Sequence, residues 1–153
     1  MNPELHQMVD LFTRILHLYS AIDKKPKDFG TGDLLYVSEI HAIHTISSNP
    51  EINLTRLAEL SGVTTGAMSQ TVKRLVNKRY IAKYQTRNRK EIQLRLSDKG
   101  YLINQHYEKF EKERFGFAER LYENASEADI TLIRNLFQVI YQNMREMQQD
   151  HES

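Results

Sequence analysis

The fold of this chain is decided by the stretch Leu54-Thr55-Arg56-Leu57-Ala58-Glu59-Leu60-Ser61-Gly62-Val63. It predicts a short helix that ends at Gly62, because glycine adopts the left-handed backbone of a sharp inter-helix turn at little steric cost. Thr55 is the expected N-cap of this helix, and Thr64 or Thr65 is expected to cap the next one. Two short helices joined by such a turn predict a helix-turn-helix.

The second helix of the pair is expected over Thr65–Lys78, and two short strands follow it directly. Its apolar side, which we expect in the core, carries Met68, Val72 and Leu75. Residues Ile81–Gln85 and Ile92–Leu96 alternate in strand fashion, with Thr86–Glu91 between them. A hairpin directly after a helix-turn-helix predicts a winged helix, with the connecting segment as the wing.

Positive charge is concentrated in the same region. Between Thr64 and Arg95 the chain has nine Lys or Arg residues and one acid, Glu91, although its formal net charge is only +1. Such a local patch favours nucleic-acid binding, because affinity comes largely from neutralising phosphates. Charge alone leaves a solvated basic face as the alternative, but charge together with the helix-turn-helix pattern favours DNA.

Length and composition exclude several other function classes. With 153 residues the chain is long enough for one domain, or a small domain with helical extensions, around a buried core. It has no apolar run near the ~20 residues of a membrane span and no signal-peptide pattern. It has no cysteine, which excludes disulfides and thiol chemistry. We therefore expect a cytoplasmic protein that does not contact membranes.

Motifs of the common enzyme classes are absent from the sequence. It contains no Gly-rich phosphate loop, no Gly-x-Ser-x-Gly and no His-Glu-x-x-His. We therefore expect no enzymatic activity and no cofactor.

Apolar residues recur at steps of three and four near both ends of the chain. One such seam lies in residues 5–22, and another follows the capping-box sequence 126–129. Ser97 is expected to cap a further long helix, whose inner stripe is Ile103, Tyr107, Phe110, Phe117 and Leu121. Seams that a small domain does not cover often pack against a second subunit, so we expect a homodimer. Packing of the terminal helices within one monomer is the alternative.

The connecting segments complete the predicted fold. Residues 24–32 are expected to form a loop, and residues 34–47 a helix that ends before Asn49-Pro50. The fold class is mainly α with a small β-hairpin wing. Residues 34–97 form the predicted winged helix-turn-helix DNA-binding domain, and residues 1–33 and 98–153 the dimerisation helices.

The whole chain resembles a MarR-family transcriptional regulator. The resemblance rests on the helix order and on the segments Leu57-Ala58, Gly62-Val63, Met68–Leu75, Asn88-Arg89-Lys90 and Leu96–Gly100. It implies a homodimer with interlocked terminal helices, a winged helix-turn-helix in each lobe, and usually a repressor released by a small signal.

Three positions depart from the pattern of that family. Asn88 stands where many members have an acid that helps orient a wing arginine. Arg79 stands where members often have glycine, two residues before the first wing strand, and Lys73 occupies a position that is often acidic. Both basic residues add positive charge, and the wing lacks the usual ion pair.

DNA contacts are expected on the exposed side of the second helix and in the wing. The set comprises Thr65, Ser69, Gln70, Lys73, Arg74, Arg87, Arg89 and Lys90. The short or bidentate polar groups suit base edges, Gln70 especially adenine. Lys73 and Arg74 are expected at phosphates, with a solvated surface role as the alternative. An arginine at the wing tip suits a narrow minor groove, and the resemblance favours Arg89 over Arg87.

The resemblance also implies an effector site between the dimerisation helices and the DNA-binding lobe. The candidates to line it are Tyr19, Tyr36, His41, His44, Tyr101 and His106. Aromatic and imidazole groups suit a planar, weakly acidic ligand. Ordinary helix packing is the alternative explanation for these residues.

A metal site is a separate possibility, since Glu39 lies near His41 and His44 and some MarR members respond to zinc. The two histidines are three residues apart and share a helix face, and His106 comes from another helix. A closed zinc site needs four ligands, however, and the sequence names no such set, so we predict no metal site.

The predicted function is therefore sequence-specific regulation of transcription on double-stranded DNA. We expect a homodimeric repressor of a pseudo-palindromic operator that a small-molecule effector releases, because a two-fold dimer places two recognition helices ~34–36 Å apart. Two alternatives remain: a zinc-responsive regulator of the same fold, and a non-specific architectural or protein-interaction protein.

Overall fold

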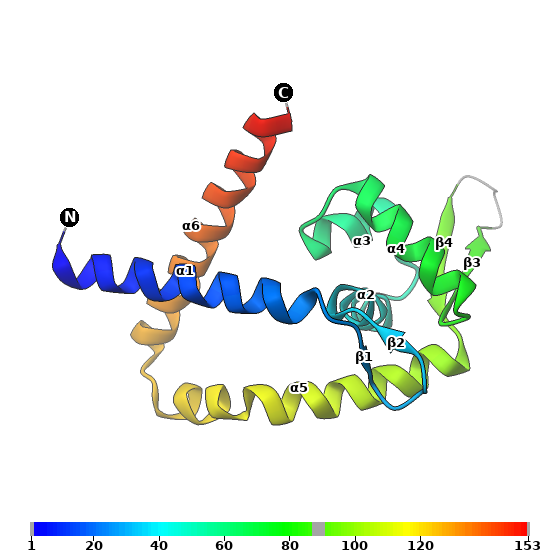
Figure 1. Ribbon diagram of the computed structural model, residues 1–153, viewed down its shortest axis with the longest axis horizontal. Coiled ribbons are helices and arrows are strands. Elements are labelled where there is room, and N and C mark those ends of the chain that lie inside the picture. The colour runs from blue at the N-terminus through cyan, green and yellow to red at the C-terminus, as the bar shows by residue number, and fades with distance from the viewer. Residues whose placement is uncertain (1, 87–90, 153) are drawn as a thin grey trace. The chain divides into compact units, whose positions relative to one another are not determined.

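The computed structural model describes residues 2–86 and 91–152 (Figure 1). The helices are α1 (Pro3–Asp23), α2 (Val37–Ser48), α3 (Leu54–Ser61), α4 (Thr65–Asn77), α5 (Asp98–Asn124) and α6 (Glu127–Glu152). The strands are β1 (Lys27–Asp28), β2 (Leu34–Leu35), β3 (Ile81–Gln85) and β4 (Ile92–Leu96). The predicted fold class, mainly α with a β-hairpin wing, is confirmed. The chain divides into two compact units, Met1–Phe110 and Glu111–Ser153.

Helices α3 and α4 form the predicted helix-turn-helix. Asn53 caps α3, since its side chain accepts a hydrogen bond of 2.8 Å from a backbone N–H of the first turn. The expectation that Thr55 caps α3 was wrong, because the helix begins before it. Gly62 ends α3 with φ +66°, the left-handed conformation predicted for the turn. Thr64 caps α4 by accepting a backbone hydrogen bond of 3.2 Å.

The wing strands have the bounds that the alternation predicted. Strands β3 and β4 pair antiparallel, with Ile81 opposite Leu96 and Gln85 opposite Ile92. Arg79 connects α4 to β3 with φ +62°. The next residue, Tyr80, donates its backbone N–H to the Leu75 carbonyl at 2.9 Å, which closes a Schellman turn. Arg79 therefore occupies a left-handed position that glycine would adopt without strain.

A small hairpin before α2 differs from the prediction. Leu34–Leu35 pairs antiparallel with Lys27–Asp28, so this leucine pair is not helical and α2 begins only at Val37. The turn is closed by the side chain of Asp28, which accepts the backbone N–H groups of Gly30 (2.8 Å), Thr31 (3.0 Å) and Gly32 (3.1 Å). Leu35 is fully buried, so burial in the core stabilises the strand over a longer helix.

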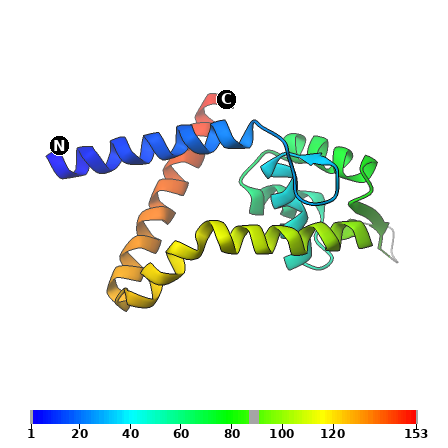
Figure 2. The ribbon, with the colours of Figure 1, turned by 60° about the horizontal axis from the view of Figure 1, so that its bottom comes forward.

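Helix α2 lies at the centre of the first unit, between the helix-turn-helix and the first part of α5 (Figures 1 and 2). It packs against α3, α4 and β4. The largest fully buried side chains of this core include Tyr80, Tyr107, Ile43, Leu57 and Leu75. The core therefore joins the recognition elements to α2 and α5.

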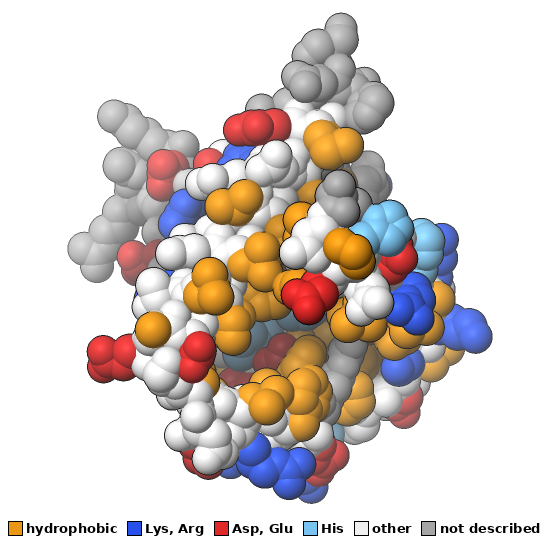
Figure 3. Space-filling view, turned by 90° about the vertical axis from the view of Figure 1, so that its left-hand side faces the viewer, with side chains coloured by type: hydrophobic (Ala, Val, Ile, Leu, Met, Phe, Trp, Pro, Cys, Tyr) orange, Lys and Arg blue, Asp and Glu red, His pale blue; other side chains and the backbone are white. Residues whose placement is uncertain are grey.

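The terminal helices keep their apolar seams largely exposed. In α1, Met8 is 57% exposed, and in α6, Phe137 is 60% exposed. The stripe expected along α5 divides: Ile103 and Tyr107 are buried in the first unit, whereas Phe117 and Leu121 are exposed. The space-filling view shows hydrophobic side chains, in orange, exposed on the surface of the molecule (Figure 3). Among the described residues, no helix has the length and apolar character needed to cross a membrane.

The capping box before α6 is confirmed. The Ser126 hydroxyl accepts the backbone N–H of Asp129 at 3.2 Å, and the Asp129 carboxylate accepts the backbone N–H of Ser126 at 3.1 Å. Ser97 likewise begins α5, where its hydroxyl accepts the Gly100 N–H at 3.1 Å.

Candidate nucleic-acid interface

Helix α4 has one buried and one exposed face. Met68, Val72 and Leu75 are at most 3% exposed and lie in the core, as predicted. The side chains expected to meet DNA lie on the exposed remainder of the helix, at Thr65, Ser69, Gln70 and Lys73. Since residues three and four apart share a helix face, Ser69, Gln70 and Lys73 form one polar surface. The packed face sets the direction in which this surface points.

Arg74 and Lys73 are neighbours in sequence but have different surroundings. Lys73 is exposed to solvent. Arg74 donates from Nε to Oε1 of Glu39 at 2.9 Å and from Nη2 to the Thr71 hydroxyl at 3.1 Å. The expected phosphate contact at Arg74 stays a prediction, but two of its nitrogens already have partners.

Glu39 has a role that sequence reasoning missed. Its side chain is fully buried, and it accepts from Lys78 Nζ at 3.2 Å and from the Tyr36 backbone N–H at 3.0 Å, besides Arg74. Lys78 also donates to the Leu34 carbonyl at 3.0 Å. The acid and its two cations are 35 and 39 residues apart in sequence, so no local pattern predicts the contact.

A second polar cluster joins the β1–β2 turn to α5. The Tyr80 hydroxyl donates to Oδ2 of Asp33 at 2.8 Å and lies 2.7 Å from the Thr31 hydroxyl. Lys99 donates to the same carboxylate and to the Lys78 carbonyl. The hydrogen bond from Lys99 lowers the pKa of Asp33, and the same contact raises the pKa of Lys99. Burial raises the pKa of Tyr80.

The wing adds exposed basic residues near α4. Lys83 is exposed on β3. Arg95 on β4 lies with its guanidinium 4.9 Å from the centre of the Tyr84 ring and 3.6 Å from a Glu51 carboxylate oxygen. The predicted wing contacts Arg87, Arg89 and Lys90 lie outside the described residues.

The predicted effector residues are only partly brought together. His41 Nε2 lies 3.0 Å from the Tyr107 hydroxyl, and His44 Nδ1 lies 3.1 Å from Oδ1 of Asn104. The centre of the Tyr107 ring lies 5.5 Å from that of the His41 ring and 5.6 Å from that of the His44 ring. Tyr107, which the sequence assigned to packing, is thus the residue that contacts both histidines.

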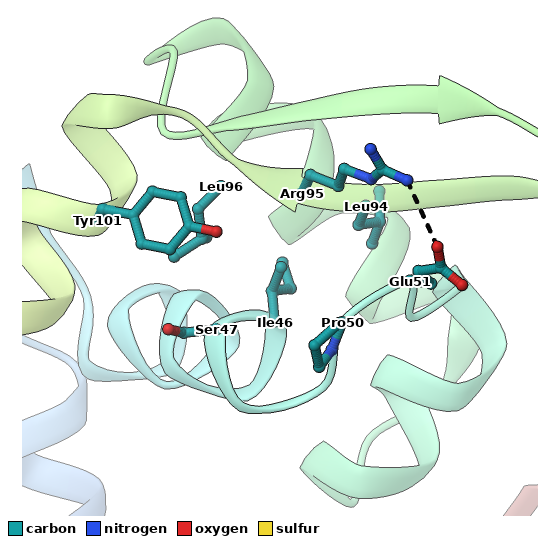
Figure 4. Close-up of a pocket in the computed structure, with 8 residues that line it drawn as sticks. All are labelled: Ile46, Ser47, Pro50, Glu51, Leu94, Arg95, Leu96 and Tyr101. Carbon is teal, nitrogen blue, oxygen red and sulfur yellow. Dashed lines mark ion pairs between the residues drawn. The ribbon is translucent and has the colours of Figure 1, made fainter.

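The other four candidates lie elsewhere. His106 lies against Gly30, where an added Cβ would overlap its ring. Tyr36 stands at the start of α2 and Tyr19 in α1. Tyr101 lines a separate pocket of about 330 Å³ between the end of α2, β4 and the start of α5 (Figure 4).

That pocket is lined by both apolar and charged side chains. Ile46 and Leu94 line it, and the ion pair of Arg95 with Glu51 crosses one side (Figure 4).

As for metals, among the described side chains no three His, Asp or Glu residues lie close enough to hold an ion. His41 and His44 instead meet Tyr107 and Asn104.

Comparison with known proteins finds a family match in the central segment. Residues 35–92 match the MarR family. Across nearly the whole chain the fold resembles three bacterial structures. FabT of Streptococcus pneumoniae, solved in complex with DNA, has a TM-score of 0.62 at 21% identity, covering 93% of this chain and 95% of that one.

The adhesin competence repressor AdcR of Streptococcus pyogenes has a TM-score of 0.70 at 15% identity, covering 92% and 98% of the two chains. ZitR of Lactococcus lactis, described as a zinc-responsive MarR family member, has a TM-score of 0.66 at 12% identity, covering 92% and 99%. At these identities the likeness concerns the fold. No curated protein matches the sequence.

Proposed function

We propose that this chain, whose residues 35–92 match the MarR family, is a homodimeric winged-helix repressor of a pseudo-palindromic operator. We assign DNA binding to residues 34–97 and dimerisation to residues 1–33 and 98–153. An effector of low molecular weight releases the repressor from DNA.

The observation that carries this proposal is the arrangement of α4. Its polar surface at Ser69, Gln70 and Lys73 is exposed, while the opposite face is fully packed in the core. A helix held in this way presents amide and hydroxyl groups in a defined orientation, which reading base edges requires. The basic wing strands beside it supply the charge for phosphate contacts.

The exposed seams of α1 and α6 support the dimer. Leu11 and Ile15 of α1 are 53% and 52% exposed, and Leu132 of α6 is 69% exposed. Long apolar stripes of this kind usually mark a subunit interface, because water contact with so much apolar surface is unfavourable. A two-fold dimer then places two copies of α4 in successive major grooves.

We propose that the effector binds near His41, His44 and Tyr107, where α2 meets α5. These groups present two imidazoles from α2, in the proposed DNA-binding segment, and a phenol from α5, in the proposed dimerisation segment. An effector that binds better to one spacing of the two lobes lowers DNA affinity by its differential affinity for the two states.

Selection of purified protein against a random duplex library, with the solution mass measured in parallel, tests the function. We expect a dimer that enriches a two-fold symmetric site. Salt-sensitive binding to every duplex without enrichment would contradict the repressor and favour an architectural role.

A further inference from the structure

Glu39 is the one acid in the described core that receives two cations from the recognition helix. It is 0% exposed, and its carboxylate accepts from Arg74 Nε at 2.9 Å and from Lys78 Nζ at 3.2 Å. Arg74 and Lys78 lie one turn apart on the last half of α4 and just beyond its end. Glu39 lies in the first turn of α2, where it also accepts the Tyr36 N–H.

The energetics favour keeping these contacts intact. A buried carboxylate that loses a partner remains as an uncompensated charge, and breaking such a pair is strongly destabilising. A phosphate group that drew both Arg74 and Lys78 away would leave Glu39 close to that state, with only the Tyr36 N–H as a partner, and one that drew away a single cation would weaken its compensation. Lys78 is further held by the Leu34 carbonyl at 3.0 Å. Both cations therefore already have partners within the protein in the absence of DNA.

We propose that Glu39 is a positioning residue for DNA reading, which locks the rotation of α4 through Arg74 and Lys78, while Lys73 neutralises phosphate. The inference rests on the proposed function, and it changes the role predicted for Arg74. Arg74 acts by orienting the surface that carries Ser69 and Gln70. The Arg74 side chain is 48% exposed, so it could also reach a phosphate. The salt dependence of DNA binding separates this phosphate contact from the orienting role.

The dependence of DNA affinity on salt distinguishes a phosphate contact from an orienting contact. Each phosphate contact contributes about 0.9 to the slope of log affinity against log salt, so a residue used in both half-sites contributes about 1.8. Orientation changes the preference for the selected operator over a random duplex and leaves the slope unchanged. Both quantities come from the same titrations of fluorescent duplexes.

The first variants are Arg74→Ala and the matched control Lys73→Ala. For Arg74→Ala we expect an unchanged slope on random duplex and a preference for the operator that falls by about tenfold, the size of one impaired base contact, because Ser69 and Gln70 are then less well oriented. For Lys73→Ala we expect a slope lower by about 1.8 and an unchanged preference. A slope lower by this amount for Arg74→Ala would overturn the proposal.

Glu39→Gln provides a second test, in which the two roles predict different changes in the preference for the operator over random duplex. If Glu39 only competes with phosphate for the cations, removing its charge strengthens binding to operator and random duplex by the same factor. If it positions α4, the freed cations leave random binding equal or stronger, while the preference for the operator falls. An unchanged preference overturns the proposal. Circular dichroism at the assay temperature ensures that only folded variants are compared.

Failure of the proposed function is visible separately. A wild-type protein without operator preference would contradict the repressor, whereas the slopes of Arg74→Ala and Lys73→Ala on random duplex would still decide whether Arg74 contacts phosphate.

Discussion

Gly100 lies so close to the backbone carbonyl oxygen of Tyr80 that a Cβ atom at this position would overlap it. The same carbonyl accepts the Ser97 backbone N–H at 3.0 Å and the Ser97 hydroxyl at 3.1 Å. The first turn of α5 is therefore held directly against the residue that precedes the wing. Only glycine permits this approach.

Gly100→Ala should destabilise the protein by about 2 kcal/mol, within the range for overpacked sites, because the backbone around Tyr80 must shift. Urea unfolding measures the effect. The matched control is Gly116→Ala in the same helix, where an added Cβ meets no atom within 4 Å. There alanine should stabilise by up to ~1 kcal/mol through helix propensity. Equal effects of the two substitutions would contradict the close approach.

Arg79→Gly should stabilise the fold, because Arg79 holds a left-handed φ of +62° after α4. This conformation costs a non-glycine residue about 1–2 kcal/mol. Part of the gain from glycine is lost, because glycine also gives the unfolded chain more conformational freedom. The expected net gain is about 1 kcal/mol in urea unfolding. Arg79→Ala removes the same charge and retains the strain, so a gain of equal size in that variant would refute the explanation.

Stability should depend on pH through Asp33 and Lys99. The pKa of Asp33 is lowered in the folded state by its hydrogen bond from Lys99. The ionised pair therefore contributes stability at pH values above the unfolded pKa, about 3.9, and this contribution is lost as the pH falls through the lower folded pKa. Asp33→Asn should destabilise at neutral pH, and the difference from wild type should shrink in acid.

The partner variant Lys99→Met is the control for that assignment. In a Lys99→Met background, Asp33→Asn should have a smaller effect at neutral pH, since the two residues act as one contact. Additive effects would show that Asp33 gains its stability elsewhere, for instance from Tyr80.

Phe137→Glu should dissociate the proposed dimer. Phe137 lies in the α6 seam with 60% of its side chain exposed, and a buried, unpaired carboxylate at an interface is strongly unfavourable. Light scattering should report a mass close to that of one chain. Gln138→Glu, one position along the helix, introduces the same charge and should retain the dimer. If both variants had the mass of a dimer, this seam would be excluded as the interface.

Gln70→Ala should alter base preference. A bidentate amide contact to adenine discriminates against other bases by about 1–3 kcal/mol, so its loss should relax one position in each half-site of the selected operator. Repeating the duplex selection with the variant measures this change. A uniform loss of affinity on all sequences would mean that Gln70 contacts the backbone.

Much of the fold was predictable because the sequence patterns that specify its helix ends and strands each span only a few residues. The cap at Thr64, the turn at Gly62 and the capping box at Ser126 each involve residues within four positions of one another. The wing strands follow from alternation over five residues each. Where such signals compete, prediction failed: Leu34–Leu35 suits a helix or a strand, and pairing with Lys27–Asp28 decides between them.

The candidate site was predictable in part. The exposed polar surface of α4 follows from helical spacing around Met68, Val72 and Leu75. The different surroundings of Lys73 and Arg74 do not, because adjacent residues in a helix point in directions about 100° apart and only the packed structure shows what each one meets.

The order of helices, the wing strands, the basic patch and the apolar seams were predictable from the amino-acid sequence alone, since each depends on periodicity or charge along a short segment. Tertiary packing was needed to show that the buried Glu39 pairs with both Arg74 and Lys78, and that Tyr107 contacts both His41 and His44. These contacts join residues 35 to 66 positions apart. They exist because the core fixes which helix faces meet, and that choice is made by the packing of the whole unit.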